Sequence, residues 1–145
     1  MASGETYSEE YYRFSRPEAG AKGVVDKVRD GYIRRQILRR VPRGRLLDVG
    51  CGLGLFLETM AGEFELYGID LSPYAVERAA RRLPAAVLRV GSLTDGLPFE
   101  EMFDVVTAIN IFEHLDDPAA GLDAVRARLR VGGLLVAHLP TIGNR

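Results

Sequence analysis

The sequence predicts an α/β fold in which a doubly wound, mostly parallel β-sheet is covered by helices on both faces. Two observations lead to this prediction. Apolar runs of strand length alternate with helical patterns along residues 45–139, and such alternation is typical of parallel sheets built from strand–helix–strand units. Two helical segments also begin with a capping residue before proline, at Ser72 and Asp117. The 145 residues are enough for one domain with its own core.

The first half of the chain contains two predicted helices and two strands. Apolar residues with a helical period precede Pro42, which ends the first helix, and Gly31 offers a break within it. The sequence RLLDV at residues 45–49 is typical of a buried strand. A helix over residues 53–61 and a second strand over residues 65–70 follow.

The second half repeats this pattern. A helix over residues 72–82 leads to a strand over residues 85–90, and the sequence FDVVTAI forms a fourth strand over residues 103–109. The last helix covers residues 117–130. The fifth strand follows at residues 133–139.

The turn after the first strand is rich in glycine. The sequence LLDVGCGLGLF places Gly50, Gly52 and Gly54 between a strand and a helix. Glycine tolerates a left-handed backbone and lets a ligand approach the main chain, while a helix N-terminus attracts an anion. In a doubly wound sheet, ligands bind at the carboxyl ends of the strands, where the chain reverses direction. The sequence therefore predicts a cofactor at this turn.

Two cofactor classes use such a turn. One class is the dinucleotides, but a dinucleotide-binding fingerprint that begins at Gly50 needs glycine at the position of Leu55. Leu55 therefore argues against a dinucleotide cofactor. Asp70 ends the second strand 20 residues after Gly50, where a carboxylate can accept hydrogen bonds from two ribose hydroxyls. Nicotinamide and S-adenosyl cofactors both carry this ribose. A purely structural alternative is that Asp70 stabilises the N-terminus of the following helix.

Composition limits the partners. Residues 1–45 carry 11 Lys or Arg and 6 acids, but the net charge of the whole chain is −1, so we interpret the basic part as a solvated helix face rather than a nucleic-acid site. One cysteine and two histidines argue against a zinc site and for a reducing compartment. No apolar run has the length of a signal peptide or membrane span. We expect a cytoplasmic protein without metal, nucleic-acid partner or membrane span.

Five segments resemble, in order, the motifs of class I S-adenosylmethionine-dependent methyltransferases. They are LLDVGCGLG, LYGIDLSP, GSLTDGLPF, FDVVTAINIFEHLDDP and LRVGGLLVAHLPT, within residues 46–141. The Glu-His-Leu sequence after the fourth strand is similar to the small-molecule branch that includes ubiquinone and menaquinone biosynthesis methyltransferases. The resemblance implies a Rossmann-like sheet of order 3-2-1-4-5, S-adenosylmethionine as cofactor with S-adenosylhomocysteine as product, and methyl transfer to a small-molecule acceptor.

The resemblance also implies which residues bind the methionine end of the cofactor. Asp48 would hold this end together with the loop that contains Gly50, Cys51, Gly52 and Gly54. Cys51 is expected to be a small loop residue rather than a redox group, because methyl transfer from a sulfonium needs no protein thiol.

The nucleoside end of the cofactor would lie against the next two strands. The resemblance implies that Asp70 binds the ribose, and that Ile69 and Leu71 form part of an apolar slot for adenine. The family commonly has an adenine-binding aspartate where this chain has Ser92, followed by Leu93. A serine oxygen can accept the same hydrogen bond without the assistance of a charge.

Two residues after the fourth strand are implied to face the reacting centre. Asn110 would lie at the sulfonium end, and His114 is the candidate base that takes a proton from an acceptor hydroxyl. A helix cap or local packing is the alternative role of His114. His138, near the end of the fifth strand, is interpreted as structural.

The two ends of the chain carry further expectations. Residues 1–23 are expected to form a flexible lid segment, in which Arg13 could pair with the methionine carboxylate, or else a frayed helix. Residues 24–145 are expected to be the cofactor-binding core, C-terminally incomplete because the family has seven strands and five are counted here. The exposed edge of the fifth strand then predicts a homodimer. The alternative function is a non-catalytic S-adenosylmethionine-binding module that lacks the acceptor-binding part.

Overall fold

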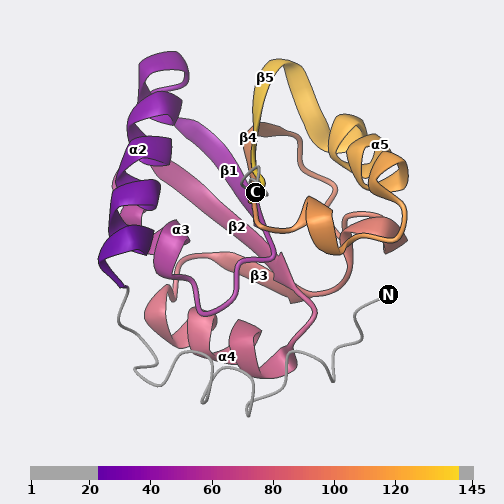
Figure 1. Cartoon of the computed structure of the whole chain (residues 1–145), viewed down its shortest axis with the longest axis horizontal. Helices are drawn as coiled ribbons and strands as arrows, with labels where there is room; N and C mark the ends of the chain where they lie inside the picture. Colours follow the sequence, from indigo (N-terminus) through magenta and orange to yellow (C-terminus); the bar gives the residue numbers. More distant parts are fainter. Residues whose placement is uncertain (1–22, 141–145) are drawn as a thin grey trace, which may run out of the picture.

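The computed structural model describes residues 23–140, and a five-stranded sheet lies at its centre (Figure 1). The elements in chain order are α2 (Val24–Arg40), β1 (Gly44–Val49), α3 (Leu55–Thr59), β2 (Phe64–Asp70), α4 (Pro73–Arg82), β3 (Val87–Val90), the 3₁₀ turn η2 (Leu93–Asp95), β4 (Phe103–Ile109), the 3₁₀ turn η3 (Phe112–His114), α5 (Pro118–Arg128) and β5 (Leu129–His138). The strand order is β3-β2-β1-β4-β5, and all four pairings are parallel. The predicted fold class and strand order are confirmed.

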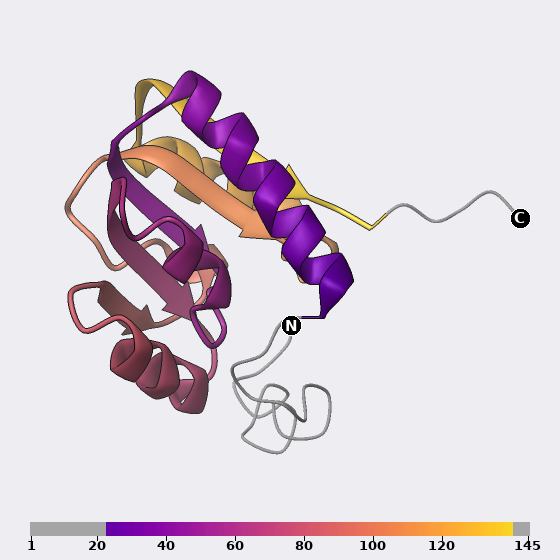
Figure 2. The same ribbon diagram turned by 90° about the vertical axis from the view of Figure 1, so that its left-hand side faces the viewer.

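The sheet separates two apolar layers, because successive strand residues point to opposite faces. Leu46 and Val105 belong to the layer covered by α2, α3 and α4, whereas their neighbours Leu47 and Val106 belong to the layer that packs against α5. Figure 2 shows α2 across one face of the sheet, with α5 on the other side. All four of these strand residues are fully buried. The near-continuous apolar strands of the sequence therefore reflect a sheet that is covered on both faces.

α2 is one continuous helix, so the expected break at Gly31 is wrong. Asp30, Ile33 and Ile37 are buried on one face of α2, and Arg34 donates a hydrogen bond from Nε to the backbone oxygen of Thr59 at 3.0 Å. Glycine within a helix costs about 1 kcal/mol relative to alanine. The packed face of α2 outweighs that cost, so the helix continues through Gly31.

Both predicted capping residues of α4 and α5 are confirmed. The Ser72 side chain accepts a hydrogen bond from the backbone N–H of Ala75 at 3.2 Å. Asp117 does the same for Ala120 at 3.1 Å. Each cap satisfies one of the N–H groups that the first turn of a helix leaves without an intrahelical partner.

Other element boundaries differ from the sequence-based expectation. α3 begins only after Gly54, which has the left-handed φ of 81°, and β3 begins at Val87 rather than at residue 85. α5 ends at Arg128, and β5 already begins at Leu129 rather than at residue 133. An irregularity in the β4–β5 register separates the first pair of these strands from the rest. The pairs Phe103–Leu129 and Val105–Leu134 enclose one residue on β4 but four on β5, so β5 includes a stretch before its apolar run.

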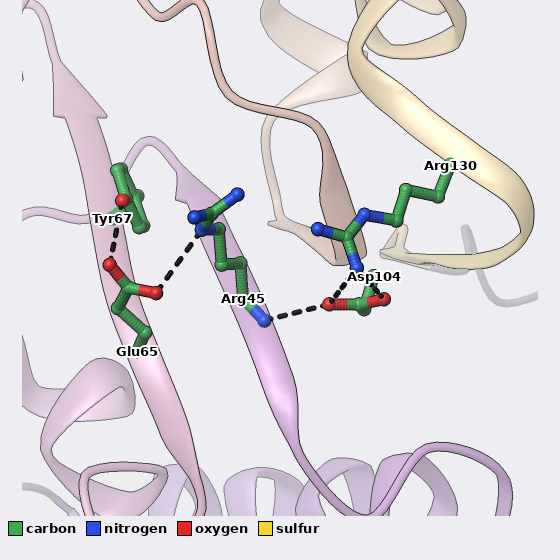
Figure 3. A network of polar contacts seen from close by, with 5 residues as sticks. All are labelled: Arg45, Glu65, Tyr67, Asp104 and Arg130. Carbon is green, nitrogen blue, oxygen red and sulfur yellow. Dashed lines mark hydrogen bonds and ion pairs between the residues drawn. The ribbon is translucent and has the colours of Figure 1, made fainter.

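A network of polar residues joins the amino ends of β1, β2 and β4 (Figure 3). Asp104 on β4 accepts a hydrogen bond from the backbone N–H of Arg45 at 2.9 Å and pairs with the Arg130 guanidinium at 3.1 Å. The Arg45 side chain donates to Glu65 at 3.1 Å, and Tyr67 donates to the other oxygen of Glu65 at 2.9 Å. The bonds from Tyr67 and Arg45 lower the pKa of Glu65. Because Arg130 lies on β5, Asp104 links the edge strand to the centre of the sheet.

We expect Asp104→Ala to lower the free energy of unfolding by about 1–3 kcal/mol, because it removes the acceptor of a backbone N–H and the partner of Arg130. Urea unfolding measures this loss. Glu65→Ala is the matched control from the same network, and it should have the smaller effect because the Arg45–Glu65 pair is largely exposed to solvent. Equal losses in the two variants would contradict the role assigned to Asp104.

Candidate functional site

A cavity of about 500 Å³ opens at the carboxyl ends of β1, β2 and β4. β1 and β4 are neighbours in the sheet but not in the sequence, so this is the point at which the chain reverses direction. Ligands of doubly wound folds bind at such a point. Ten of the eleven predicted site residues line the cavity, and they are Asp48, Gly50, Cys51, Gly52, Asp70, Leu71, Ser92, Leu93, Asn110 and His114.

The glycine-rich loop adopts the left-handed backbone that its sequence suggests. The φ angles of Gly50 and Gly52 are 73° and 54°, which side chains with a Cβ seldom adopt. The backbone N–H groups of Gly50 and Cys51 both donate to the Ile69 oxygen, at 2.8 and 2.9 Å. Gly54 lies outside the cavity lining, where it caps α3 and faces Ala79 of α4.

Cys51 is buried in this loop, and its thiol is not activated. Burial is the main reason that the pKa of the Cys51 thiol lies well above its usual range, and the nearby carboxylates of Asp48 and Asp70 add to the effect. A reactive cysteine needs a stabilised thiolate. The arrangement therefore agrees with a packing role for Cys51.

Asp70 connects the glycine loop to the start of α4. One carboxylate oxygen accepts from the backbone N–H of Gly52 and the other from that of Ser72, each at 2.9 Å. The Asp70 side chain thus holds the glycine loop in place. It also stabilises the N-terminus of α4, which is the structural role that the sequence offered as an alternative. The Asp70 carboxylate also lines the cavity, and a carboxylate can accept several hydrogen bonds at once.

Asp48 lies at the floor of the cavity and is 3% exposed. Burial raises the pKa of Asp48 to about 7, and the negative charges of Asp30 and Asp70 raise it further, while a hydrogen bond from Thr107 acts in the opposite direction. The Thr107 hydroxyl donates to Asp48 at 2.7 Å. A bound cation at this point would favour the charged carboxylate.

Three residues of α2 also line the cavity, and sequence reasoning missed all of them. They are Asp26, Arg29 and Asp30. Arg29 contacts Asp26 at 3.1 Å and Asp30 at 3.0 Å. Asp30 is 2% exposed on the same helix face as the core residues Ile33 and Ile37. A carboxylate at an apolar position of the helical pattern was the signal that could have identified this group.

Beyond β3, Ser92 is the cap of the turn η2. Its hydroxyl oxygen accepts from the backbone N–H of Thr94 at 3.3 Å and lies 2.9 Å from the Thr94 hydroxyl. Leu93 is buried beside it, while Leu71 is half-buried. Thr94 also lines the cavity and was not predicted. The serine is thus held in place, with a second hydroxyl beside it.

Beyond β4, the segment that contains η3 forms another wall of the cavity. His114 projects from this wall with a side chain that is 58% exposed, and its Nε2 lies 3.8 Å from Glu113. Asn110 begins the segment at the end of β4. His138 lies outside the cavity lining. Arg13, the expected partner of a cofactor carboxylate, lies outside the described residues.

Gly50 should not tolerate a side chain, because a Cβ there would overlap the Ile111 side chain and φ is left-handed. We expect Gly50→Ala to lower the free energy of unfolding by about 1–2 kcal/mol from backbone strain, with a further steric cost. A double-mutant cycle with Ile111→Ala, followed by urea unfolding, should show that the double variant loses less than the sum of the single variants. Strict additivity would exclude the steric contribution.

Among residues 23–140, no group of three or more His, Cys, Asp or Glu side chains is arranged to hold a metal ion. None of the helices there combines the length and apolar character that crossing a membrane requires.

Comparison with known proteins gives one family match and many similar relatives. Residues 47–137 match the family described as a methyltransferase domain. A ubiquinone biosynthesis O-methyltransferase of Psychrobacter cryohalolentis is 31% identical over 125 residues, covering 78% of this chain and 49% of the relative. One of Xanthomonas campestris pv. campestris is 37% identical over 119 residues, covering 77% and 48%. The chain thus spans about half the length of the curated relatives it matches.

Solved structures share the fold across nearly the whole chain. CalS10, an amino pentose methyltransferase of Micromonospora echinaspora with bound S-adenosylmethionine, has a TM-score of 0.75 and 30% identity, and the match covers 93% of this chain and 58% of CalS10. KedS8, a sugar N-methyltransferase of Streptoalloteichus, has a TM-score of 0.71 and 30% identity, with coverage of 94% and 54%.

Proposed function

The chain belongs to the methyltransferase domain family, and from this premise we propose that its cavity binds S-adenosylmethionine for methyl transfer to a small-molecule acceptor. The observation that supports this most is the position of the cavity. It lies at the point where the sheet reverses direction, and ten residues implied by the class I methyltransferase motifs line it. Relatives described as small-molecule methyltransferases, one of them with S-adenosylmethionine bound, support the same assignment.

The residues present fit the chemistry of this cofactor. Asp48 offers a carboxylate to the methionine ammonium, and the left-handed glycine loop lets the cofactor approach the main chain. Asp70 offers a carboxylate to the ribose hydroxyls, and Leu71 and Leu93 provide apolar surface for adenine. A volume of about 500 Å³ is within the usual range for small-molecule sites.

The protein's part in the reaction is to align the partners and to hold a proton. S-adenosylmethionine supplies an activated methyl group, whose bonding electrons remain with sulfur when the acceptor attacks in line. The walls around Asn110 and His114 bring the acceptor close to that methyl group, and such proximity supplies much of the rate. His114 Nε2 takes the proton that a hydroxyl or ammonium acceptor must lose. Glu113, 3.8 Å away, stabilises the positive charge on the ring.

The alternative is a module that binds S-adenosylmethionine without transferring its methyl group. Its motivation is the coverage of only about half of each curated relative. Incubation of the 145-residue chain with S-adenosylmethionine and a panel of phenols and amino sugars separates the two functions. Acceptor-dependent release of S-adenosylhomocysteine supports the transferase, whereas binding without any release supports the module.

We propose a small-molecule acceptor rather than a nucleic acid, and a cytoplasmic site of action. β5 lies at the edge of the sheet, and Val131 on it is fully exposed. A homodimer through this edge remains a prediction, and light scattering at high protein concentration tests it.

A further inference from the structure

Asn110, at the carboxyl end of β4, is held by His138 of β5 through two hydrogen bonds. Its backbone N–H donates to the His138 oxygen at 2.9 Å, and its side-chain Oδ1 lies 2.8 Å from His138 Nδ1. Asn110 has a φ of 56°, and among residues 23–140 it is the one residue other than glycine with a positive φ. Asparagine adopts this conformation more readily than most residues do. The two bonds therefore stabilise an uncommon backbone state.

The Asn110 amide oxygen faces His138 Nδ1, and the roles of these two atoms follow from the tautomer of the ring. This arrangement requires the tautomer in which the neutral His138 ring carries its proton on Nδ1 and donates it to Asn110 Oδ1, because an amide oxygen can only accept. The amide nitrogen of Asn110 keeps its two hydrogens, and among residues 23–140 no hydrogen bond donated by this nitrogen is found. Asn110 lines the cavity, whereas His138 does not. His138 thus determines which end of the Asn110 amide is left to serve the cavity.

The backbone hydrogen bond of Asn110 also affects the cavity wall that contains His114. Ile109 and His138 form the last pair of the β4–β5 register, and the bond from the Asn110 N–H extends this pairing by one residue. The chain then turns into the segment 111–116, most of which lines the cavity. A change in the Asn110 backbone would therefore redirect the wall that carries His114.

We propose that His138 is a positioning residue for the cofactor site, which presents the Asn110 N–H₂ group to bound S-adenosylmethionine and sets the direction of the His114 segment. This inference rests on the proposed function. A purely structural role, in which His138 only secures the edge strand, would alter unfolding but neither cofactor affinity nor the orientation of the amide.

Calorimetric titration of S-adenosylmethionine into the 145-residue chain tests the proposal. His138→Ala should raise Kd about three- to tenfold, which corresponds to the loss of one hydrogen bond. His138→Asn should largely restore the wild-type Kd, because its amide nitrogen can donate from nearly the position of Nδ1. Val131→Ala is the matched control on the same strand, because Val131 is fully exposed and does not line the cavity, and the Kd of this variant should remain that of the wild type.

Each outcome has a separate meaning. No binding by the folded wild-type chain would refute the proposed function itself. Wild-type binding together with an unchanged Kd in His138→Ala would overturn only the positioning role. If His138→Ala does not fold, long-range ¹H–¹⁵N spectra of the wild-type imidazoles decide, and only His114 and His138 contribute to them. We expect neutral His138 to be protonated at Nδ1, and protonation at Nε2 would overturn the inference.

Discussion

Asp70→Ala should raise the Kd for S-adenosylmethionine at least about a hundredfold. The carboxylate accepts the backbone N–H groups of Gly52 and Ser72, and under the proposed function it also accepts the ribose hydroxyls. Hydrogen bonds to a charged group are worth about 1.5–3 kcal/mol each, and 1.4 kcal/mol corresponds to a factor of ten in affinity. Removal of the side chain therefore eliminates the ribose contact and also the hydrogen bond that holds the glycine loop.

Two further variants separate these contributions. Asp70→Asn keeps the shape but places an N–H₂ group against one of the two backbone donors, so its Kd should lie between those of the wild type and Asp70→Ala. Asp95→Ala is the charge-matched control, because Asp95 is exposed just beyond the cavity lining. A wild-type Kd in Asp70→Ala would remove Asp70 from the binding site.

Asp48→Asn should abolish a pH-dependent loss of stability of up to about 4 kcal/mol. The folded-state pKa of Asp48 is about 7, against an ordinary 3.8, and each pKa unit corresponds to 1.36 kcal/mol. Between these values the folded protein keeps a proton that the unfolded chain has lost, so this group's contribution to stability falls as pH rises from about 4 to 7. Urea unfolding of both proteins at pH 4 and pH 8 measures the difference. Parallel pH profiles would contradict the burial of a titrating Asp48.

The same group should make cofactor affinity depend on pH. A methionine ammonium beside Asp48 favours the ionised carboxylate, so the Kd of the wild type should decrease as pH rises from about 5.5 to 7.5. Asp48→Asn should bind more weakly and with a flatter pH profile. The charged groups that act on Asp48 are Asp30, Asp70 and Arg29. Asp30→Asn removes one of the two negative charges and so shows how much that charge contributes to the pKa of Asp48.

Local patterns in the sequence predict most of the fold. The cap-and-proline pairs at Ser72 and Asp117 mark the starts of α4 and α5, because capping depends on residues that are adjacent in the chain. The strand bounds of β4 agree with those predicted from the apolar run FDVVTAI. The helix does not break at Gly31, because the packing of Ile33 and Ile37 against the rest of the protein stabilises it. Local sequence patterns do not report such tertiary packing.

Some residues of the candidate site could likewise be predicted from local sequence patterns, and others could not. The residues that follow β1, β2 and β4 reach the cavity because parallel strands end at one edge of the sheet, which the alternating pattern predicts. Arg29 and Asp30 reach it only through the way α2 packs across the sheet. The pairing of Asn110 with His138 depends on the β4–β5 register, which shifts near the start of β5. Long-range packing and register explain what local sequence patterns do not provide.

Calorimetric titration of S-adenosylmethionine into the purified 145-residue chain at pH 7.5, with NADH titrated in parallel, tests the central claim most directly. We predict saturable binding of S-adenosylmethionine to one site per chain, competition by S-adenosylhomocysteine, and no heat from NADH. Absence of binding in a sample shown to be folded by circular dichroism, or preferential binding of NADH, would contradict the assignment of this cavity.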